Sequence, residues 1–211
     1  MREVSTIGID IAKSVFQVHG INAVADVVIR RKLRRSEVEE FFKRLPACLI
    51  GIEACASGHY WARTLIDMGH DVKLMPAAYV KPYVKRQKND AADAEAICEA
   101  VQRPTMRFVP VKSEEQQGVL MLHRARELLV RQKTMLINAL RAHLAELGIV
   151  ARLGVMGVRD LVALVEETDQ CEVPEIVQRA LLPLCDQLRH VQEKIVEMDR
   201  QILEWHRSNA L

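Results

Sequence analysis

The sequence predicts an α/β domain followed by an α-helical arm, and two observations support this fold class. Short apolar runs alternate with helical patterns through roughly the first half of the chain, as expected for a sheet flanked by helices. After Pro110 the apolar residues recur instead at helical spacing over long stretches. We therefore expect one domain at 1–110 and a helical arm at 111–211.

The predicted domain starts with three strands, at 4–11, 14–21 and 26–32, whose short connections favour an antiparallel meander. Ser36, with Glu39 three residues later, predicts a capping box at the start of the next helix. The remaining expected elements alternate in type: a strand at 49–52, a helix at 57–68, a strand at 72–75 and a helix at 90–101. This order is that of a ribonuclease H-like mixed sheet with flanking helices.

The arm is predicted to contain two long helices, separated by a turn-rich break and a short helix at 158–165. The first runs from Ser113 to about Leu147, and the second follows Pro174 with the apolar spacing of a coiled-coil seam. Pro183 costs an interior helix about 3 kcal/mol, so we expect a kink or a late helix start there. Such an antiparallel coiled-coil arm packs on itself or on a second chain. The seam residues expected at an oligomer interface are Leu184, Leu188, Val191, Ile195, Met198 and Ile202.

Composition narrows the class of protein. Hydrophobic residues make up 49% of the chain, enough for a sizeable core, and the formal net charge is only +2. The five cysteines are scattered with no C-x-x-C pair, which favours a reduced cytoplasm over a disulfide framework or a zinc ribbon. No signal-peptide pattern and no apolar run of membrane-spanning length is present, so we expect a cytoplasmic protein without a membrane partner.

Four carboxylates are the strongest functional signal. Asp10 and Glu53 each end a short apolar run that is typical of a buried strand. Asp90 and Asp93 are three residues apart at a predicted helix start, so both project from one helix face. Each acid alone has a structural explanation, as a turn acid, a strand-end acid or a first-turn acid favoured by the helix dipole. Together they predict a divalent-metal site, because acids at the ends of buried strands are rarely left unpaired.

The chemistry expected of such a site is phosphodiester cleavage. Adjacent strands would place Asp10 beside Glu53, and the helix would supply Asp90 and Asp93. Two Mg²⁺ or Mn²⁺ ions about 4 Å apart need shared carboxylates and otherwise bind water and phosphate oxygens. We therefore predict that these four residues are both the metal ligands and the catalytic residues.

Three segments carry a resemblance to a known family: IGIDIAK at 7–13, GIEAC at 51–55, and KNDAADA at 88–94. They resemble the DEDD-type insertion-sequence transposases, which have a RuvC-like N-terminal domain and include the Piv-type DNA invertases and the bridge-RNA-guided recombinases. The resemblance implies magnesium-dependent DNA cleavage and exchange, a structured guide RNA in some members, and oligomers held partly by the helical arm. Carried over by motif, the DEDD metal set is Asp10, Glu53, Asp90 and Asp93.

The resemblance also implies a C-terminal transposase domain that supplies a serine nucleophile. No serine of this chain lies in a matching motif. We therefore expect an N-terminal portion that lacks this domain and does not complete strand exchange alone.

Two groups of basic residues are candidates for nucleic-acid binding. One precedes the Asp90 pair and the other lies on the first long helix of the arm; alternatively, both are solvated surfaces. The residues are Lys81, Lys85, Arg86, Lys88, Arg124, Arg126, Arg131 and Lys133. His59, six residues after Glu53, is interpreted as a structural histidine.

Three other functions remain open on the sequence. A Holliday-junction-type nuclease would use the same metals with water as the nucleophile. A non-catalytic module would bind nucleic acid and dimerise through the arm without needing metal. The segment at 8–14 also resembles the first phosphate-binding strand turn of actin-fold sugar kinases. Those enzymes need two such domains and glycine-rich adenosine motifs, which the nine glycines of this chain do not supply.

Overall fold

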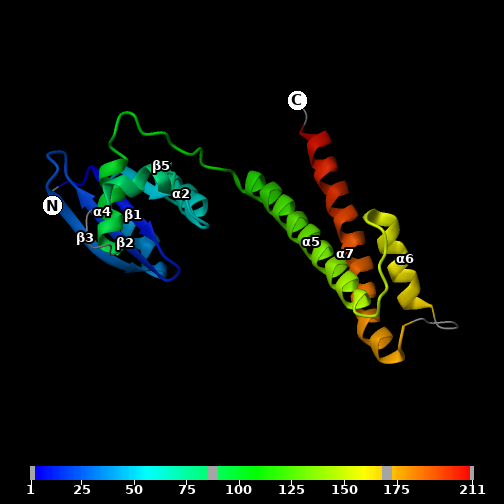
Figure 1. The fold of residues 1–211 in the computed structure, drawn as a ribbon. Helices are drawn as coiled ribbons and strands as arrows, with labels where there is room; N and C mark the ends of the chain where they lie inside the picture. Colours follow the sequence, from blue (N-terminus) through cyan, green and yellow to red (C-terminus); the bar gives the residue numbers. More distant parts are fainter. Residues whose placement is uncertain (1–2, 85–89, 168–172, 210–211) are drawn as a thin grey trace. The chain divides into compact units, whose positions relative to one another are not determined.

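The computed structural model describes residues 3–84, 90–167 and 173–209, with the backbone alone for Asp90 and Ala91 (Figure 1). The chain divides into two compact units, Met1–Glu114 and Glu115–Leu211. We call them the N-terminal unit and the helical unit, and each is described by itself.

The N-terminal unit is built on a five-stranded sheet in the order β3-β2-β1-β4-β5. Its strands are β1 (Thr6–Ile11), β2 (Val15–Ile21), β3 (Val27–Arg34), β4 (Leu49–Glu53) and β5 (Asp71–Met75). The first three form the predicted antiparallel meander, whereas β4 pairs parallel with both β1 and β5. The predicted α/β class with a mixed sheet is confirmed, and the strand order is consistent with a ribonuclease H-like fold.

Helices cover both faces of this sheet. On one face, α1 (Val38–Lys43) and α2 (Gly58–Asp67) contribute Phe42 and Trp61 to a core that includes the isoleucines of β1 and β4. On the other face, α4 (Asp90–Ala100) contacts β1, β2 and β4. Short segments complete the unit: η1 (Arg35–Glu37), α3 (Ala77–Val80) and η2 (Lys81–Tyr83).

Two glycines allow α4 to lie directly on the sheet. A Cβ added to Gly8 would lie 2.2 Å from the carbonyl oxygen of Ala94 and 2.3 Å from the amide nitrogen of Cys98. A Cβ added to Gly51, beside Gly8 on the parallel strand, would lie 2.8 Å from the Cβ of Val101. At Gly8 the obstructing atoms are backbone, so no larger residue fits there unless the helix moves.

The first helix begins differently from the prediction. Ser36 lies inside η1, and Glu37 rather than Glu39 accepts the hydrogen bond from the Arg34 amide, at 2.7 Å. The reason is that β3 stays paired with β2 as far as Arg34, opposite Val15. The three-residue spacing of a capping box is kept, but it starts two residues earlier than Ser36.

The helical unit contains α5 (Glu114–Ala145), α6 (Gly154–Glu166) and α7 (Glu175–Ser208), which confirms two long helices around a short one. Within this unit α5 and α7 run antiparallel (Figure 1). Leu144 of α5, Val165 of α6 and Leu188 of α7 belong to one buried cluster. None of the helices in the described ranges has the length and apolar character needed to cross a membrane.

Pro183 lies within α7, so of the two expected outcomes, a kink or a late helix start, the late start does not occur. A proline in a helix interior removes one backbone hydrogen bond and costs about 3 kcal/mol. Leu181 and Cys185, two residues before and after it, are both fully packed in the core of the helical unit. Their burial offsets the cost, because a fully buried apolar side chain contributes about 1.5–3 kcal/mol.

The seam predicted for an oligomer interface packs largely against the chain's own helices. Leu188, Val191 and Ile202 are buried within the single chain. The other three seam residues, Leu184, Ile195 and Met198, are half-buried. Much of the heptad pattern in α7 is therefore explained by packing inside the helical unit.

His59 has a structural role, and it makes the stability of the N-terminal unit depend on pH. Its Nδ1 accepts a hydrogen bond from the Lys112 amide at 3.2 Å, which joins α2 to the segment that follows α4. Burial, followed by the charges of Lys112 and Arg63, lowers the pKa of His59 below its usual 6.5. The unfolded chain therefore takes up this proton at a higher pH than the folded protein does, so stability decreases as the pH falls below about 6.5.

The urea midpoint of the N-terminal unit is accordingly expected to fall between pH 7.5 and pH 5.5, in the window set by the lowered His59 pKa. A His59→Gln variant should lose part of that pH dependence, whereas His143→Gln, in α5, should keep it. If the urea midpoint fell equally with pH in the wild type and in the His59→Gln variant, this role of His59 would be contradicted.

Candidate metal and nucleic-acid site

Two parallel strands place Asp10 and Glu53 side by side. The strands β1 and β4 are in register with Ile9 opposite Ile52, so the next residue on each strand is one of the two acids. Because side chains alternate along a strand, both acids share the sheet face of Gly8, which is the face covered by α4. The carboxyl ends of these strands therefore present two carboxylates to the same space, as the sequence predicted.

The helix α4 adds a third carboxylate to that space. Asp93 lies in its first turns and lines a pocket of about 660 Å³ together with Asp10 and Glu53. All three carboxylates are half-buried. The remaining lining comes from the segment after β5 and consists of Ala77, Ala78, Val80, Lys81 and Val84.

Asp90 opens α4, three residues before Asp93, but its side chain lies outside the described residues. Its place in the metal set stays a prediction. Among the described residues, no three His, Cys, Asp or Glu side chains gather closely enough to hold one ion.

The donor chemistry of the pocket fits a hard divalent cation. Carboxylate oxygens are the protein ligands that Mg²⁺ and Mn²⁺ prefer, and Asp10, Glu53 and Asp93 supply them from rigid elements. Burial raises the pKa of the nearby Cys98 thiol to about 12, so this cysteine stays protonated. Its Sγ lies 3.7 Å from the carbonyl oxygen of Thr6, which identifies Cys98 as a packing residue and not a thiolate ligand.

The basic residues predicted to bind nucleic acid have different surroundings. Lys81 lies in the carboxylate pocket, whereas Lys85, Arg86 and Lys88 fall outside the described residues. The structure therefore places Lys81, the described member of this group, at the predicted metal site.

Of the four α5 cations that were predicted to bind nucleic acid, two have acidic partners in the helical unit. Arg126 is ion-paired with Asp199 of α7, which raises the pKa of the guanidinium, and Arg131 lies 3.7 Å from Glu127. Arg124 is exposed, and Lys133 is half-buried. Arg126 thus has a structural role between two helices, which weakens its candidacy as a nucleic-acid contact.

The sequence analysis did not identify a basic strand that lies close to the acids. β3 carries Arg30, Arg31 and Lys32 in succession, and Arg34 and Arg35 follow after one leucine. The sequence signal was this run of cations. Its closeness to the acids became visible only from the sheet order, in which β3 lies two strands from β1.

Comparison with known proteins gives the family. The sequence profile of a family described as Transposase, the DEDD transposases of the IS110 group, matches residues 7–149. A Pseudomonas aeruginosa protein named "Probable family 20 transposase" is 48% identical over 207 residues, which are 98% of this chain and 61% of that protein.

Two further relatives are transposases for named insertion sequences. The one for element IS1328 of Yersinia enterocolitica is 37% identical over 202 residues, covering 96% of this chain and 60% of the relative. The one for element IS1111A of Coxiella burnetii is 34% identical over 202 residues, covering 96% of this chain and 56% of the relative. The chain thus spans less than two thirds of the length of these curated relatives.

Asp10, Glu53 and α4 all lie within the matched residues 7–149, and the relatives align with nearly the whole chain. This chain therefore belongs to the DEDD transposase family of IS110-type insertion sequences.

Proposed function

We propose that the N-terminal unit provides the magnesium-dependent site at which an insertion-sequence transposase cleaves and exchanges DNA strands. One observation carries the proposal: two parallel strands and a helix bring Asp10, Glu53 and Asp93 to the walls of a single pocket. Family membership supports the reaction class, and the donor chemistry supports the metal.

In this proposal the four acids, Asp10, Glu53, Asp90 and Asp93, bind the metal and hold it against the scissile phosphate. Bound Mg²⁺ supplies Lewis-acid stabilisation of the phosphate and of the attacking and leaving oxygens. The role of Lys81 is to neutralise charge on the phosphate, because this lysine lines the same pocket as the carboxylates. Gly8 and Gly51 position the site, since they let α4 carry its acids onto the sheet.

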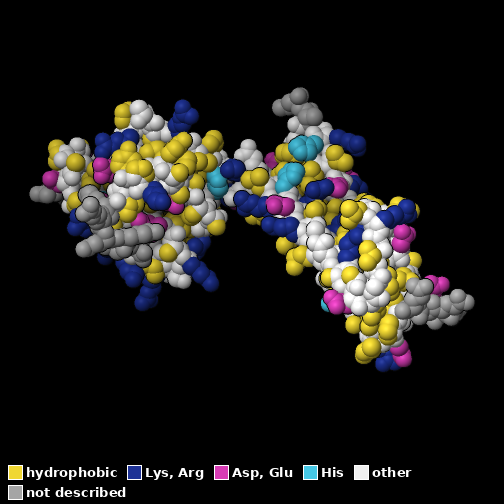
Figure 2. Space-filling model, viewed as in Figure 1, with side chains coloured by type: hydrophobic (Ala, Val, Ile, Leu, Met, Phe, Trp, Pro, Cys, Tyr) yellow, Lys and Arg dark blue, Asp and Glu magenta, His cyan; other side chains and the backbone are white. Residues whose placement is uncertain are grey.

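The proposal assigns further roles by domain. The N-terminal unit acts as the RuvC-like catalytic domain, with DNA as substrate and a structured guide RNA as the partner implied by the family resemblance. The helical unit acts as an antiparallel coiled-coil arm that holds a homo-oligomer together. Exposed Met121, Leu128 and Met135 support this arm, because they recur every seven residues along α5. Figure 2 shows hydrophobic side chains on the visible surface of the helical unit, interspersed with charged ones.

Manganese binding tests the proposed site directly. An electron paramagnetic resonance titration of the chain with Mn²⁺ is expected to show saturable binding that Mg²⁺ competes away, because both ions prefer carboxylate oxygens. The titration is run with and without a DNA oligonucleotide, since a phosphate completes the coordination of such ions. Absence of specific Mn²⁺ binding in both titrations would contradict the proposal.

A further inference from the structure

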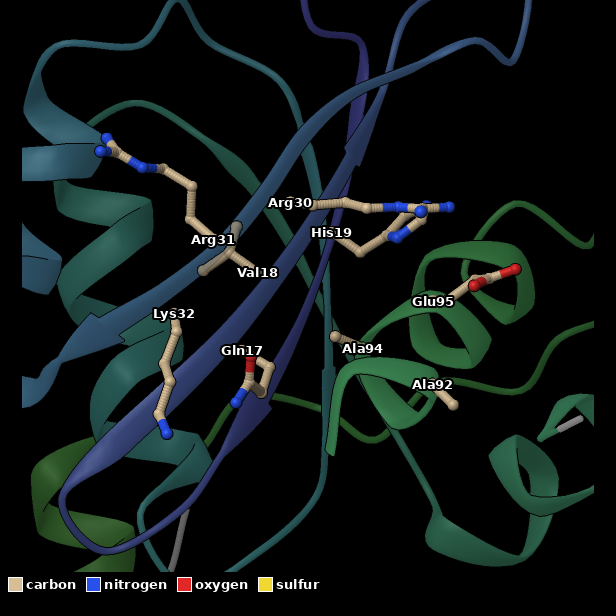
Figure 3. A pocket seen from close by; sticks show the side chains of 9 residues that line it. All are labelled: Gln17, Val18, His19, Arg30, Arg31, Lys32, Ala92, Ala94 and Glu95. Atoms are coloured by element: carbon tan, nitrogen blue, oxygen red, sulfur yellow. The ribbon is translucent and has the colours of Figure 1, made fainter. Parts of the chain in front are cut away.

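A second pocket, of about 430 Å³, lies between the β2–β3 hairpin and α4 (Figure 3). The two strands contribute Gln17, Val18, His19, Arg30, Arg31 and Lys32, and the helix contributes Ala92, Ala94 and Glu95. Figure 3 shows His19 and Arg30 projecting toward Glu95 on the helix. We call this site the basic pocket.

Strand register puts the basic pocket next to the carboxylates. Asp10 of β1 pairs with Gln17 of β2, which pairs with Lys32 of β3. These three residues share the α4 face of the sheet, so Lys32 lies two strand spacings, about 10 Å, from Asp10. Two residues further along β2 on the same face, His19 pairs with Gly8 of β1 on one side and with Arg30 of β3 on the other. One face of the sheet therefore changes from acidic to basic over two strands.

The charge of the basic pocket suits an anion. Arg30 and Lys32 are exposed, and neither is paired with a carboxylate in the part of the chain that the structure describes. Among the described residues that line the pocket, Glu95 on the helix wall is the acid, and it offsets part of the charge. Alternation sends Arg31 to the opposite face, where its guanidinium carbon lies 5.8 Å from the centre of the Phe41 ring. Arg30 and Lys32 are therefore the two lining cations that belong to the α4 face of the strand.

Protection of an edge strand is the alternative explanation for these cations. β3 is an edge strand, and lysine or arginine on an edge discourages pairing with another chain. That role does not require a concave site, an adjacent amide or a position beside the carboxylates. The basic pocket has all three features, since Gln17 lies between Lys32 and Asp10.

We propose that the basic pocket binds backbone phosphates of a nucleic-acid strand and so guides that strand to the carboxylates; the inference rests on the function proposed above. Arg30 and Lys32 contact the phosphates, and Gln17 donates to a phosphate or sugar oxygen between them and Asp10. Contacts of this kind fix the register of a strand without reading its sequence. Arg30 and Lys32 are positioning residues in this scheme and not catalytic ones.

The test is fluorescence anisotropy of the full chain with labelled single-stranded DNA and with RNA of the same sequence. An Arg30→Gln/Lys32→Gln variant is expected to lose roughly tenfold or more in affinity at about 0.1 M salt, through the loss of two phosphate contacts. The slope of log K against log salt should become shallower by roughly 1.4, because each phosphate contact on a single strand contributes roughly 0.7.

Matched variants separate this site from general electrostatics and from misfolding. Lys43→Gln/Arg44→Gln removes the same two residue types from exposed positions at the end of α1, and should change the affinity and the salt slope much less. Arg30→Lys/Lys32→Arg keeps the charges and should retain most of the affinity. A loss of binding on DNA assigns the basic pocket to the substrate strand, and a loss confined to RNA assigns it to a guide strand; either supports the proposal.

Unchanged affinity of the Arg30→Gln/Lys32→Gln variant for both DNA and RNA would overturn the inference. Manganese binding is measured on the same variant to keep the two proposals apart. It should be unchanged, because neither residue lines the carboxylate pocket. Normal Mn²⁺ binding with unchanged nucleic-acid affinity would refute the basic pocket alone, whereas absent Mn²⁺ binding in the wild-type chain would refute the proposed function.

Discussion

Replacing Asp10 with asparagine is expected to lower the affinity of the chain for Mn²⁺ by about 100-fold or more. Loss of an outer-shell partner already costs about 10- to 100-fold in metal affinity, and the proposed role of Asp10 is that of a direct ligand. In a longer protein that contains this chain, DNA strand cleavage should fall by about 10²–10³-fold or more. Asparagine has nearly the same shape as aspartate, so the half-buried position tolerates the change without loss of fold.

The matched control for this variant is Asp71→Asn. Asp71 begins β5, whose other end, Met75, is paired with Glu53 beside the pocket. The same substitution is thus made in the same sheet but at the end remote from the carboxylates. It should leave both Mn²⁺ binding and cleavage unchanged. Equal Mn²⁺ affinities for the Asp10 and Asp71 variants would remove Asp10 from the ligand set.

Replacing Gly8 with alanine is expected to destabilise the N-terminal unit by about 3 kcal/mol or more. Overpacking a core commonly costs about 1–3 kcal/mol, and here the added methyl group would meet backbone atoms of α4 at 2.2 and 2.3 Å. Backbone in a packed helix does not rotate away as a side chain does, so α4 must shift from the sheet. Because Asp93 is carried by α4, Mn²⁺ affinity should fall together with stability.

Urea denaturation followed by the fluorescence of Trp61 measures this effect. Trp61 is buried in the N-terminal unit, and a Trp205→Phe background makes it the one reporter, since the chain has two tryptophans. Gly118→Ala is the matched control, because a Cβ on Gly118 in α5 meets nothing within 4 Å. That change should leave the unfolding transition reported by Trp61 unaltered, because Gly118 belongs to the helical unit. Wild-type stability of the Gly8→Ala variant would mean that α4 does not pack against β1 at this distance.

The elements that the sequence predicted correctly are those with strong local patterns. Strands β1 and β2 and the two long helices were each marked by an apolar period, and period is a local property of the chain. The errors came where pairing or packing overrode a local signal. Pairing of β3 with β2 moved the helix cap away from Ser36, and core burial kept α7 helical through Pro183.

The candidate site likewise has a part that local sequence patterns predicted and a part that they did not. Asp10 and Glu53 were identifiable because each ends a buried apolar run. They lie next to each other because their two strands pair in parallel. The side of the carboxylate pocket that is lined by Lys81 and the rest of the segment after β5 was not predictable in detail. Short irregular segments have no hydrophobic periodicity from which their position could be predicted. For the α7 seam, the heptad spacing predicted an apolar stripe but did not identify what covers it.

By itself, the sequence determined the candidate residues for the chemistry and the alternation of strands and helices, because residue type and hydrophobic period can be read directly from the order of residues. The tertiary structure alone decided which residues face one another across strands and helices. Strand register set Asp10 beside Glu53 on one side and beside Gln17 and Lys32 on the other. Those pairings depend on hydrogen bonds and packing between segments far apart in the chain, for which no local pattern exists.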